Sequence, residues 1–179
     1  IGGFKATAPV TPGELGQAMA KFAANPGDAE AAAILAKSPA MVGRTRTTCV
    51  ATLLTGGHAD NALPQSATAT VNCRIFPGVE VETVREALAA AIADPQVKIT
   101  TRDAPKASPV SEMRPDVMRA IGNAVHAVYP DLPIVPYLES GGTDGKVYRT
   151  AGIPTYASSG RPSKPPAMHA HGPHERPPA

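Results

Sequence analysis

The chain has 179 residues, a formal net charge of +2 and a hydrophobic content of 42%. This length allows one large domain or two small ones, and the hydrophobic fraction is enough for a core. The small net charge and the lack of tryptophan argue against a nucleic acid or an anionic membrane as partner. Because no apolar run approaches a membrane span, we expect a soluble protein, either cytoplasmic or periplasmic/secreted.

The N-terminal segment, residues 1–43, predicts helices and offers no functional motif. A helical pattern covers residues 11–37, and Asn25-Pro26-Gly27 divides it into two helices. We therefore treat residues 1–43 as a helical segment of unclear role.

Residues 47–102 predict a small α+β layer in the order strand, strand, helix, strand. The first strand, 47–55, is rich in Thr, Val and Leu. The second, 66–75, alternates strictly between polar and apolar residues, which is typical of an antiparallel strand with one solvated face. A helix with an apolar stripe over residues 81–92 follows, and residues 97–102 are expected to form the third strand.

The C-terminal part predicts a piece of an α/β sheet. A proline-containing linker at 104–109 precedes a helix over 115–129. Short strands are expected at 134–138 and 154–157. Between them, Ser140-Gly141-Gly142-Thr143-Asp144 leads into a short helix.

The two cysteines, Cys49 and Cys73, lie in the two neighbouring predicted strands. A bridge between them is geometrically feasible. The favoured interpretation is that both are small buried hydrophobic residues, so the redox state stays open.

Two loops contain candidate binding residues. In the loop between the first two strands, Asn61 offers a donor and an acceptor, and His58 and Asp60 have the spacing of a metal-binding pair. An ordinary solvated hairpin loop is the simpler interpretation.

Arg74, on the polar face of the second strand, is either a solvated residue or a fork for a carboxylate. The loop 140–144 is either an anion site at a helix N-terminus or an ordinary helix start.

The C-terminal tail contains three histidines, His169, His171 and His174, followed by Glu175. Such a group could bind zinc, and simple metal storage is one reading of it. A proline-rich tail with chance histidines is the alternative.

The order and spacing of these pieces resemble the zinc-dependent aminoacylase and carboxypeptidase family, which includes acetylornithine deacetylase, succinyl-diaminopimelate desuccinylase and glutamate carboxypeptidase. The resemblance covers residues 44–176. It is carried by the first strand and by the motifs Gly56-Gly57, Asn61-Ala62-Leu63-Pro64, Asn72-Cys73-Arg74, Gly141-Gly142-Thr143-Asp144, Gly152-Ile153-Pro154 and His171-Gly172-Pro173-His174-Glu175-Arg176.

The resemblance implies an α+β fold. Residues 44–107 would be part of a ferredoxin-like lid or dimerisation layer, an antiparallel sheet with helices. Residues 108–179 would be the C-terminal piece of an α/β zinc-exopeptidase domain. The lid sheet would form a homodimer.

The resemblance also implies residue roles. Asn61 and Arg74 would bind the substrate carboxylate or the scissile carbonyl, in this subunit's site or in that of a partner subunit. Gly142 and Thr143 would receive a substrate carboxylate through a backbone N–H and a hydroxyl. His171 would be a zinc ligand.

The sequence departs from the family pattern in its metal ligands. It contains no Glu-Glu pair to supply the general base, and its one His-x-Asp pair, at His58, lies in the lid turn. Two zinc ions are expected in the complete enzyme, so one matching histidine is too few.

We therefore expect a chain without catalytic residues of its own. It would be an inactive part of a zinc-dependent amidohydrolase or exopeptidase that hydrolyses an amide next to a free carboxylate, in a peptide or N-acyl amino acid. The alternative is a non-catalytic dimerisation or binding module.

Overall fold

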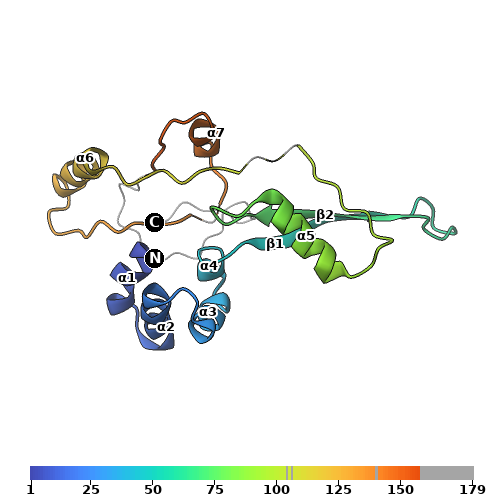
Figure 1. The fold of residues 1–179 in the computed structure, drawn as a ribbon, viewed down its shortest axis with the longest axis horizontal. Coiled ribbons are helices and arrows are strands. Elements are labelled where there is room, and N and C mark those ends of the chain that lie inside the picture. Colours follow the sequence, from blue (N-terminus) through green and yellow to red (C-terminus); the bar gives the residue numbers. More distant parts are fainter. Residues whose placement is uncertain (104, 106, 140, 158–179) are drawn as a thin grey trace. The chain divides into compact units, whose positions relative to one another are not determined.

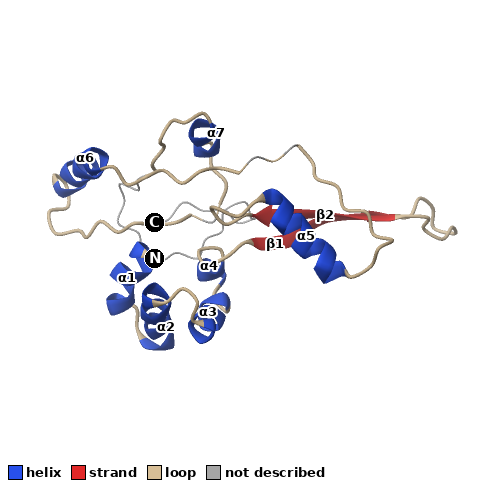
Figure 2. Ribbon diagram, viewed as in Figure 1, coloured by secondary structure: helices blue, strands red, loops and turns tan. Residues whose placement is uncertain are grey.

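The structure, a computed structural model, describes residues 1–103, 105, 107–139 and 141–157. These residues form helices and one antiparallel pair of strands, which confirms the α+β class (Figure 2). In chain order the elements are α1 (Gly2–Thr7), the 3-10 turn η1 (Ala8–Val10), α2 (Gly13–Ala24), α3 (Ala29–Ala36), α4 (Pro39–Val42), β1 (Thr48–Gly56), β2 (Ala67–Arg74), α5 (Val81–Ile92), α6 (Pro115–His126) and α7 (Gly145–Thr150) (Figure 1).

The chain divides into two compact units. The first contains Ile1–Ser111 and Val135–Thr155, and the second contains Glu112–Ile134 with the described residues from Tyr156 on. The first unit contains the N-terminal helices, both strands, α5 and α7.

The N-terminal helices α1 to α4 form a small bundle with its own core. The two helices predicted within residues 11–37 are confirmed as α2 and α3, and the break between them is local. The Asn25 side chain accepts a hydrogen bond from the N–H of Gly27 at 3.1 Å. The Asp28 carboxylate then caps α3 by accepting from the N–H of Ala31 at 2.9 Å. The buried core residues are Phe4, Ala8, Ala18, Met19, Phe22, Ala31 and Leu35.

The bundle contacts a segment that lies much later in the sequence. The Arg44 guanidinium lies over two rings, 5.0 Å from the centroid of Phe4 and 4.4 Å from that of Tyr137. A Cβ built on Gly3 would overlap the carbonyl oxygen of Pro136. Glycine is therefore required where α1 meets this segment.

The strands β1 and β2 form an antiparallel ribbon that pairs Thr48 with Arg74 at one end and Gly56 with Ala67 at the other. The predicted hairpin is confirmed. The register shifts between Ala51 and Leu53, because Thr52 is an extra residue in β1. This bulge keeps one face of the ribbon apolar, which we call the apolar ribbon face. It contains Cys49, Ala51, Leu54, Ala67, Ala69, Val71 and Cys73.

The two cysteines form a disulfide across this ribbon. Cys49 and Cys73 are register partners, their Cα atoms lie 4.1 Å apart, and their sulfur atoms are bonded. Cys49 is exposed and Cys73 is half-buried. The expectation of two buried hydrophobic thiols is therefore wrong. Composition predicts a strand around Cys49 and alternation predicts one around Cys73, but only the register makes the two residues direct neighbours.

Three expected strands do not form. Residues 97–102 have no partner strand among the described residues, and a strand is stable only where a neighbour satisfies its N–H and C=O groups. Residues 134–138 are interrupted by Pro136 and residues 154–157 begin with Pro154, and proline removes a ladder donor. The expected α/β exopeptidase piece thus contributes only α6 and α7 in the described part of the chain, and α6 ends at His126 rather than at residue 129.

Candidate carboxylate-binding site

Arg74 is the last residue of β2, where it pairs with Thr48. Its side chain is exposed and lies on the ribbon face opposite the disulfide, because neighbouring residues in a strand point to opposite faces. Strand geometry therefore places the Arg74 guanidinium at the end of the ribbon where the chain enters β1 from the N-terminal bundle.

The Arg74 guanidinium reaches Gly142, which is far away in the sequence. A Cβ built on Gly142 would lie 2.8 Å from Nη1 of Arg74. A side chain at position 142 would require the tip of the flexible Arg74 side chain to move, so glycine allows the guanidinium to lie against the backbone in its present position. The structure thus brings together two residues that the sequence proposes as carboxylate binders.

The loop around Gly142 is shaped by hydrogen bonds within it. The N–H of Gly141 donates to the Glu139 carboxylate at 3.1 Å, and the N–H of Lys146 donates to the carbonyl of Thr143 at 3.1 Å. Thr143 is exposed and directly follows Gly142. The helix that starts here, α7, has only six residues. Its dipole is therefore a minor source of positive potential, and the Arg74 guanidinium is the main one.

Arg74 has no acidic partner in the part of the chain that the structure describes. The ion pairs there join Lys21 to Glu30, Arg85 to Glu82, and Arg114 to Asp116. An arginine without an internal carboxylate keeps its planar fork of N–H donors for a ligand, and that fork matches a carboxylate in a bidentate geometry. The Arg74–Gly142 pair can therefore receive an anionic group.

Asn61 lies elsewhere, in the loop that joins the far ends of β1 and β2 (Figure 1). Arg74 is at the opposite end of a ribbon whose β2 strand has eight residues. At a rise of about 3.4 Å per residue, the ribbon separates them by roughly 24 Å. The structure therefore does not bring Asn61 together with Arg74 and Gly142 in one chain.

The predicted metal ligand, His171, and its neighbours His169 and His174 lie outside the described residues. Within the described ranges, no group of three or more His, Cys, Asp or Glu side chains could hold a metal ion. His58 and Asp60 are exposed in the hairpin loop. The described residues therefore do not fit a zinc site, and zinc binding through His171 stays a prediction.

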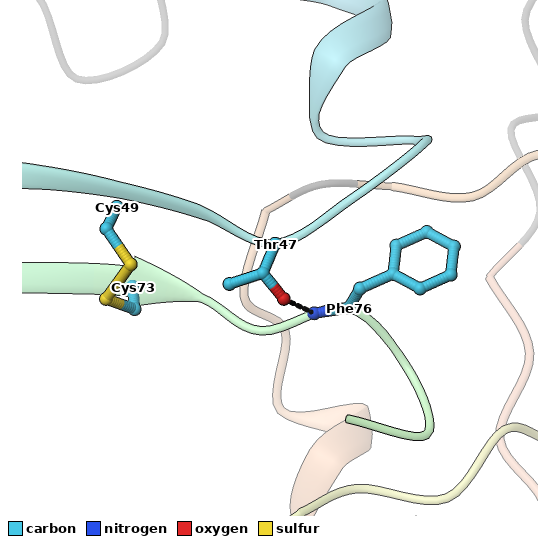
Figure 3. Close-up of a disulfide and its surroundings, with 4 residues drawn as sticks. All are labelled: Thr47, Cys49, Cys73 and Phe76. Carbon is cyan, nitrogen blue, oxygen red and sulfur yellow. Dashed lines mark hydrogen bonds between the residues drawn. A yellow bond between two sulfur atoms is a disulfide. The ribbon is translucent and has the colours of Figure 1, made fainter. Parts of the chain in front are cut away.

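Two features lie beside Arg74. One is the disulfide, which the sequence allows but does not favour. The other, which the sequence does not predict, is a hydrogen bond from the N–H of Phe76 to Oγ1 of Thr47, at 2.9 Å (Figure 3). The polar Thr47 just before a strand was a weak signal for such a contact. Its partner could not be read from the sequence, because the contact depends on the register.

Comparison with known proteins identifies the family. Residues 11–100 match the M20 family described as "Peptidase dimerisation domain". The chain belongs to this family. The matched range begins within residues 1–43 and covers α2, α3, α4, the ribbon and α5.

Individual relatives agree with this assignment. The chain is 34% identical over 116 residues to the human N-fatty-acyl-amino acid synthase/hydrolase PM20D1, covering 60% of this chain and 22% of that protein. It is 31% identical over 117 residues to the Xenopus tropicalis protein of the same name, covering 63% of this chain and 22% of the relative. It is 26% identical over 116 residues to the probable carboxypeptidase S-like 2 of Dictyostelium discoideum, covering 64% of this chain and 22% of that protein.

The chain thus spans less than a quarter of the length of each of these relatives. No solved structure matches it. Within the described ranges, every helix is too short or too polar to traverse a bilayer.

Proposed function

We propose that this chain supplies the dimerisation surface and part of the substrate-carboxylate site of an M20 amidohydrolase or exopeptidase. The reaction would be hydrolysis of an amide bond next to a free carboxylate, in a peptide or an N-acyl amino acid. The relatives support this class of substrate, since one is named for N-fatty-acyl amino acids and another as a carboxypeptidase.

The observation that carries the proposal is the approach of Arg74 to Gly142. The guanidinium has no acidic partner among the described side chains and lies against a backbone that carries no Cβ. A carboxylate bound there would receive charge-assisted hydrogen bonds from Arg74. The N–H of Gly142 and the hydroxyl of Thr143 would supply further donors from the same loop.

Asn61 has a different role in this proposal. Because it lies at the far end of the ribbon, it would act in the site of a second protomer. The complete enzyme is expected to use two zinc ions, with His171 as one ligand. The described residues supply no metal site, so the proposal concerns substrate binding and assembly only.

A binding experiment on the full chain tests the carboxylate site. N-acetylglycine is titrated into isotope-labelled chain while the Gly142 amide is followed by NMR, and N-acetylglycinamide, which lacks the carboxylate, serves as control ligand. We expect saturable binding of the acid, no binding of the amide, and at least a tenfold loss of affinity for Arg74→Ala. A lost charge-assisted hydrogen bond of about 1.5–3 kcal/mol corresponds to such a change.

Two matched controls sharpen this test. Arg102→Ala removes another exposed arginine of the same unit and should leave binding unchanged. Gly142→Ala introduces a Cβ where Arg74 lies and should weaken binding. By contrast, Gly141→Ala meets only the Glu139 side chain, at 3.6 Å, and should not. Equal binding by wild type and Arg74→Ala would reject the assignment.

The second candidate function is a non-catalytic dimerisation module. It is favoured by the apolar side chains that the ribbon exposes, among them Leu54 at 74% and Val71 at 43%. A chain that dimerises through the ribbon but binds no N-acetylglycine would support this alternative.

A further inference from the structure

The end of the ribbon that carries Arg74 is fixed on both sides. One residue before Arg74, Cys73 is bonded to Cys49. Two residues after it, the N–H of Phe76 donates to Oγ1 of Thr47 at 2.9 Å (Figure 3). The backbone of Arg74 is therefore held between a covalent crosslink and a hydrogen bond, both of which join the same two chain segments.

The disulfide does not touch the Arg74 side chain directly. Cys73 lies on the apolar ribbon face, and Arg74 points to the opposite face. Any influence of the crosslink on the guanidinium must therefore act through the backbone, by fixing the register in which Arg74 pairs with Thr48.

Little else holds this register. The ribbon has only two strands, and such a hairpin is marginal in water without packing against other elements. Its large apolar residues remain exposed, with Val50 at 62% and Leu53 at 57%. The register shift at Thr52 adds a point where pairing is irregular. The crosslink is consequently the strongest constraint on the position of Arg74.

We propose that the Cys49–Cys73 disulfide is a redox-sensitive positioning device for Arg74, and that its reduction weakens the binding of a ligand carboxylate. The inference rests on the proposed carboxylate site. With the crosslink intact, the guanidinium is held in place before the ligand arrives. Without it, binding must also order the end of the ribbon, and that cost lowers affinity.

The chemistry needs a dithiol reductant. A thiolate of the reductant attacks the exposed Cys49 sulfur, the Cys49–Cys73 bond breaks, and Cys73 leaves as a thiolate that takes up a proton. The second thiol of the reductant then attacks the reductant sulfur that is bonded to Cys49, and Cys49 leaves as a thiolate that takes up a proton. The reductant ends as a disulfide, and its two electrons and two protons reside on the two cysteine thiols. Because Cys49 is exposed, a reductant can approach it.

The test compares N-acetylglycine binding by the oxidised chain and by the chain reduced with dithiothreitol, which carries no carboxylate to compete. The Gly142 amide reports binding, and the Leu35 amide in the bundle core reports that the fold is intact. We expect the dissociation constant to rise roughly three- to tenfold on reduction and to return on reoxidation. The double variant Cys49→Ser/Cys73→Ser should match the reduced chain and should not respond to dithiothreitol.

A relocated crosslink separates positioning from general stabilisation of the ribbon. Ala51→Cys/Val71→Cys in the Cys49→Ser/Cys73→Ser background closes the same ribbon at register partners farther from Arg74. If proximity to Arg74 matters, this variant recovers only part of the affinity. Full recovery would overturn the positioning role.

The outcomes also separate this inference from the proposed function. If Arg74→Ala abolishes binding and reduction leaves the dissociation constant unchanged, the carboxylate site stands and the redox inference is wrong. If the oxidised chain does not bind N-acetylglycine, or if Arg74→Ala binds it normally, both are overturned.

Discussion

The N-terminal bundle and the β1–β2 ribbon bury their apolar residues very differently. In the bundle, Leu35 is 0% exposed and Met19 is 2% exposed, and the rings of Phe4 and Phe22 meet edge to face with centroids 5.7 Å apart. In the ribbon, Leu54 is 74% exposed. The bundle therefore has a closed core of its own, whereas the ribbon depends on a crosslink and leaves its apolar residues uncovered.

This difference in the burial of apolar side chains indicates different roles for the bundle and the ribbon. The bundle buries its apolar residues against one another, so its core is stable without a further covering surface. The ribbon has an apolar face, and neither of its edges carries a further strand from the described residues, so it is suited to pairing with another chain. The match to a dimerisation domain covers the ribbon and also α2, α3, α4 and α5, so the division between the two regions rests on their burial.

The largest expected effect comes from removing a core side chain of the bundle. Leu35→Ala should lower the free energy of unfolding by about 2–5 kcal/mol, since it leaves a cavity in a fully buried site. The matched change Leu54→Ala, on the exposed ribbon, should cost less than about 0.5 kcal/mol in the monomer. Chemical denaturation followed by circular dichroism measures both. Similar losses would remove the contrast between the regions.

Removing the crosslink should have the next largest effect, and it should be confined to the ribbon. The disulfide closes a loop with a sequence separation of 24. Cys49→Ser/Cys73→Ser should therefore cost the ribbon about 3 kcal/mol. Hydrogen exchange of the β1 and β2 amides should accelerate, while exchange in α2 and α3 should not change. Equal acceleration in the bundle would mean that the two regions unfold as one.

The smallest effect concerns α5, outside both regions. Nε of Arg85 donates to the two oxygens of Glu82 at 2.8 and 2.9 Å, and these hydrogen bonds lower the pKa of the Glu82 carboxyl, with a smaller opposing effect of burial. Because the folded-state pKa is the lower one, the stabilisation is present above the unfolded-state pKa and is lost as pH falls through the folded-state pKa. The exposed pair should contribute little to stability.

The Glu82 pKa itself is measurable. Arg85→Ala should return it to its ordinary range in an NMR titration of the side-chain carboxyl. The pKa of Asp116, which is lowered by hydrogen bonding from Arg114, serves as control and should not change. A Glu82 pKa that is unaffected by Arg85→Ala would contradict the pairing.

Local sequence patterns predict the elements that depend on neighbouring residues in the chain, such as single helices, single strands and turns. The alternation from Ala67 to Cys73 predicted β2, and Asn25 with its following proline and glycine predicted the break between α2 and α3. The extra residue at Thr52 left no signal, because a bulge depends on how two strands pair. Residues 97–102 have strand-like composition, but no described segment pairs with them, which no local pattern reveals.

The residues of the candidate site suggest separate anion-binding groups from the sequence alone, and only the family resemblance assigns Arg74 and Gly142 to substrate binding. Arg74 and Gly142 lie in segments that no periodicity connects, and their proximity arises from the three-dimensional fold. The sequence allows a bridge between Cys49 and Cys73 but favours two buried thiols, because strand patterns do not specify the register that makes them neighbours.

Sedimentation of the full chain tests most directly whether the ribbon is the assembly surface. We expect wild type to form a dimer at micromolar concentration. Leu54→Asp, on the apolar ribbon face, should be monomeric, and Val10→Asp, an equally exposed apolar site in η1 at 78%, should remain dimeric. A wild-type chain that stays monomeric well above micromolar concentration, or a Leu54→Asp variant that dimerises as tightly as wild type, would contradict the account.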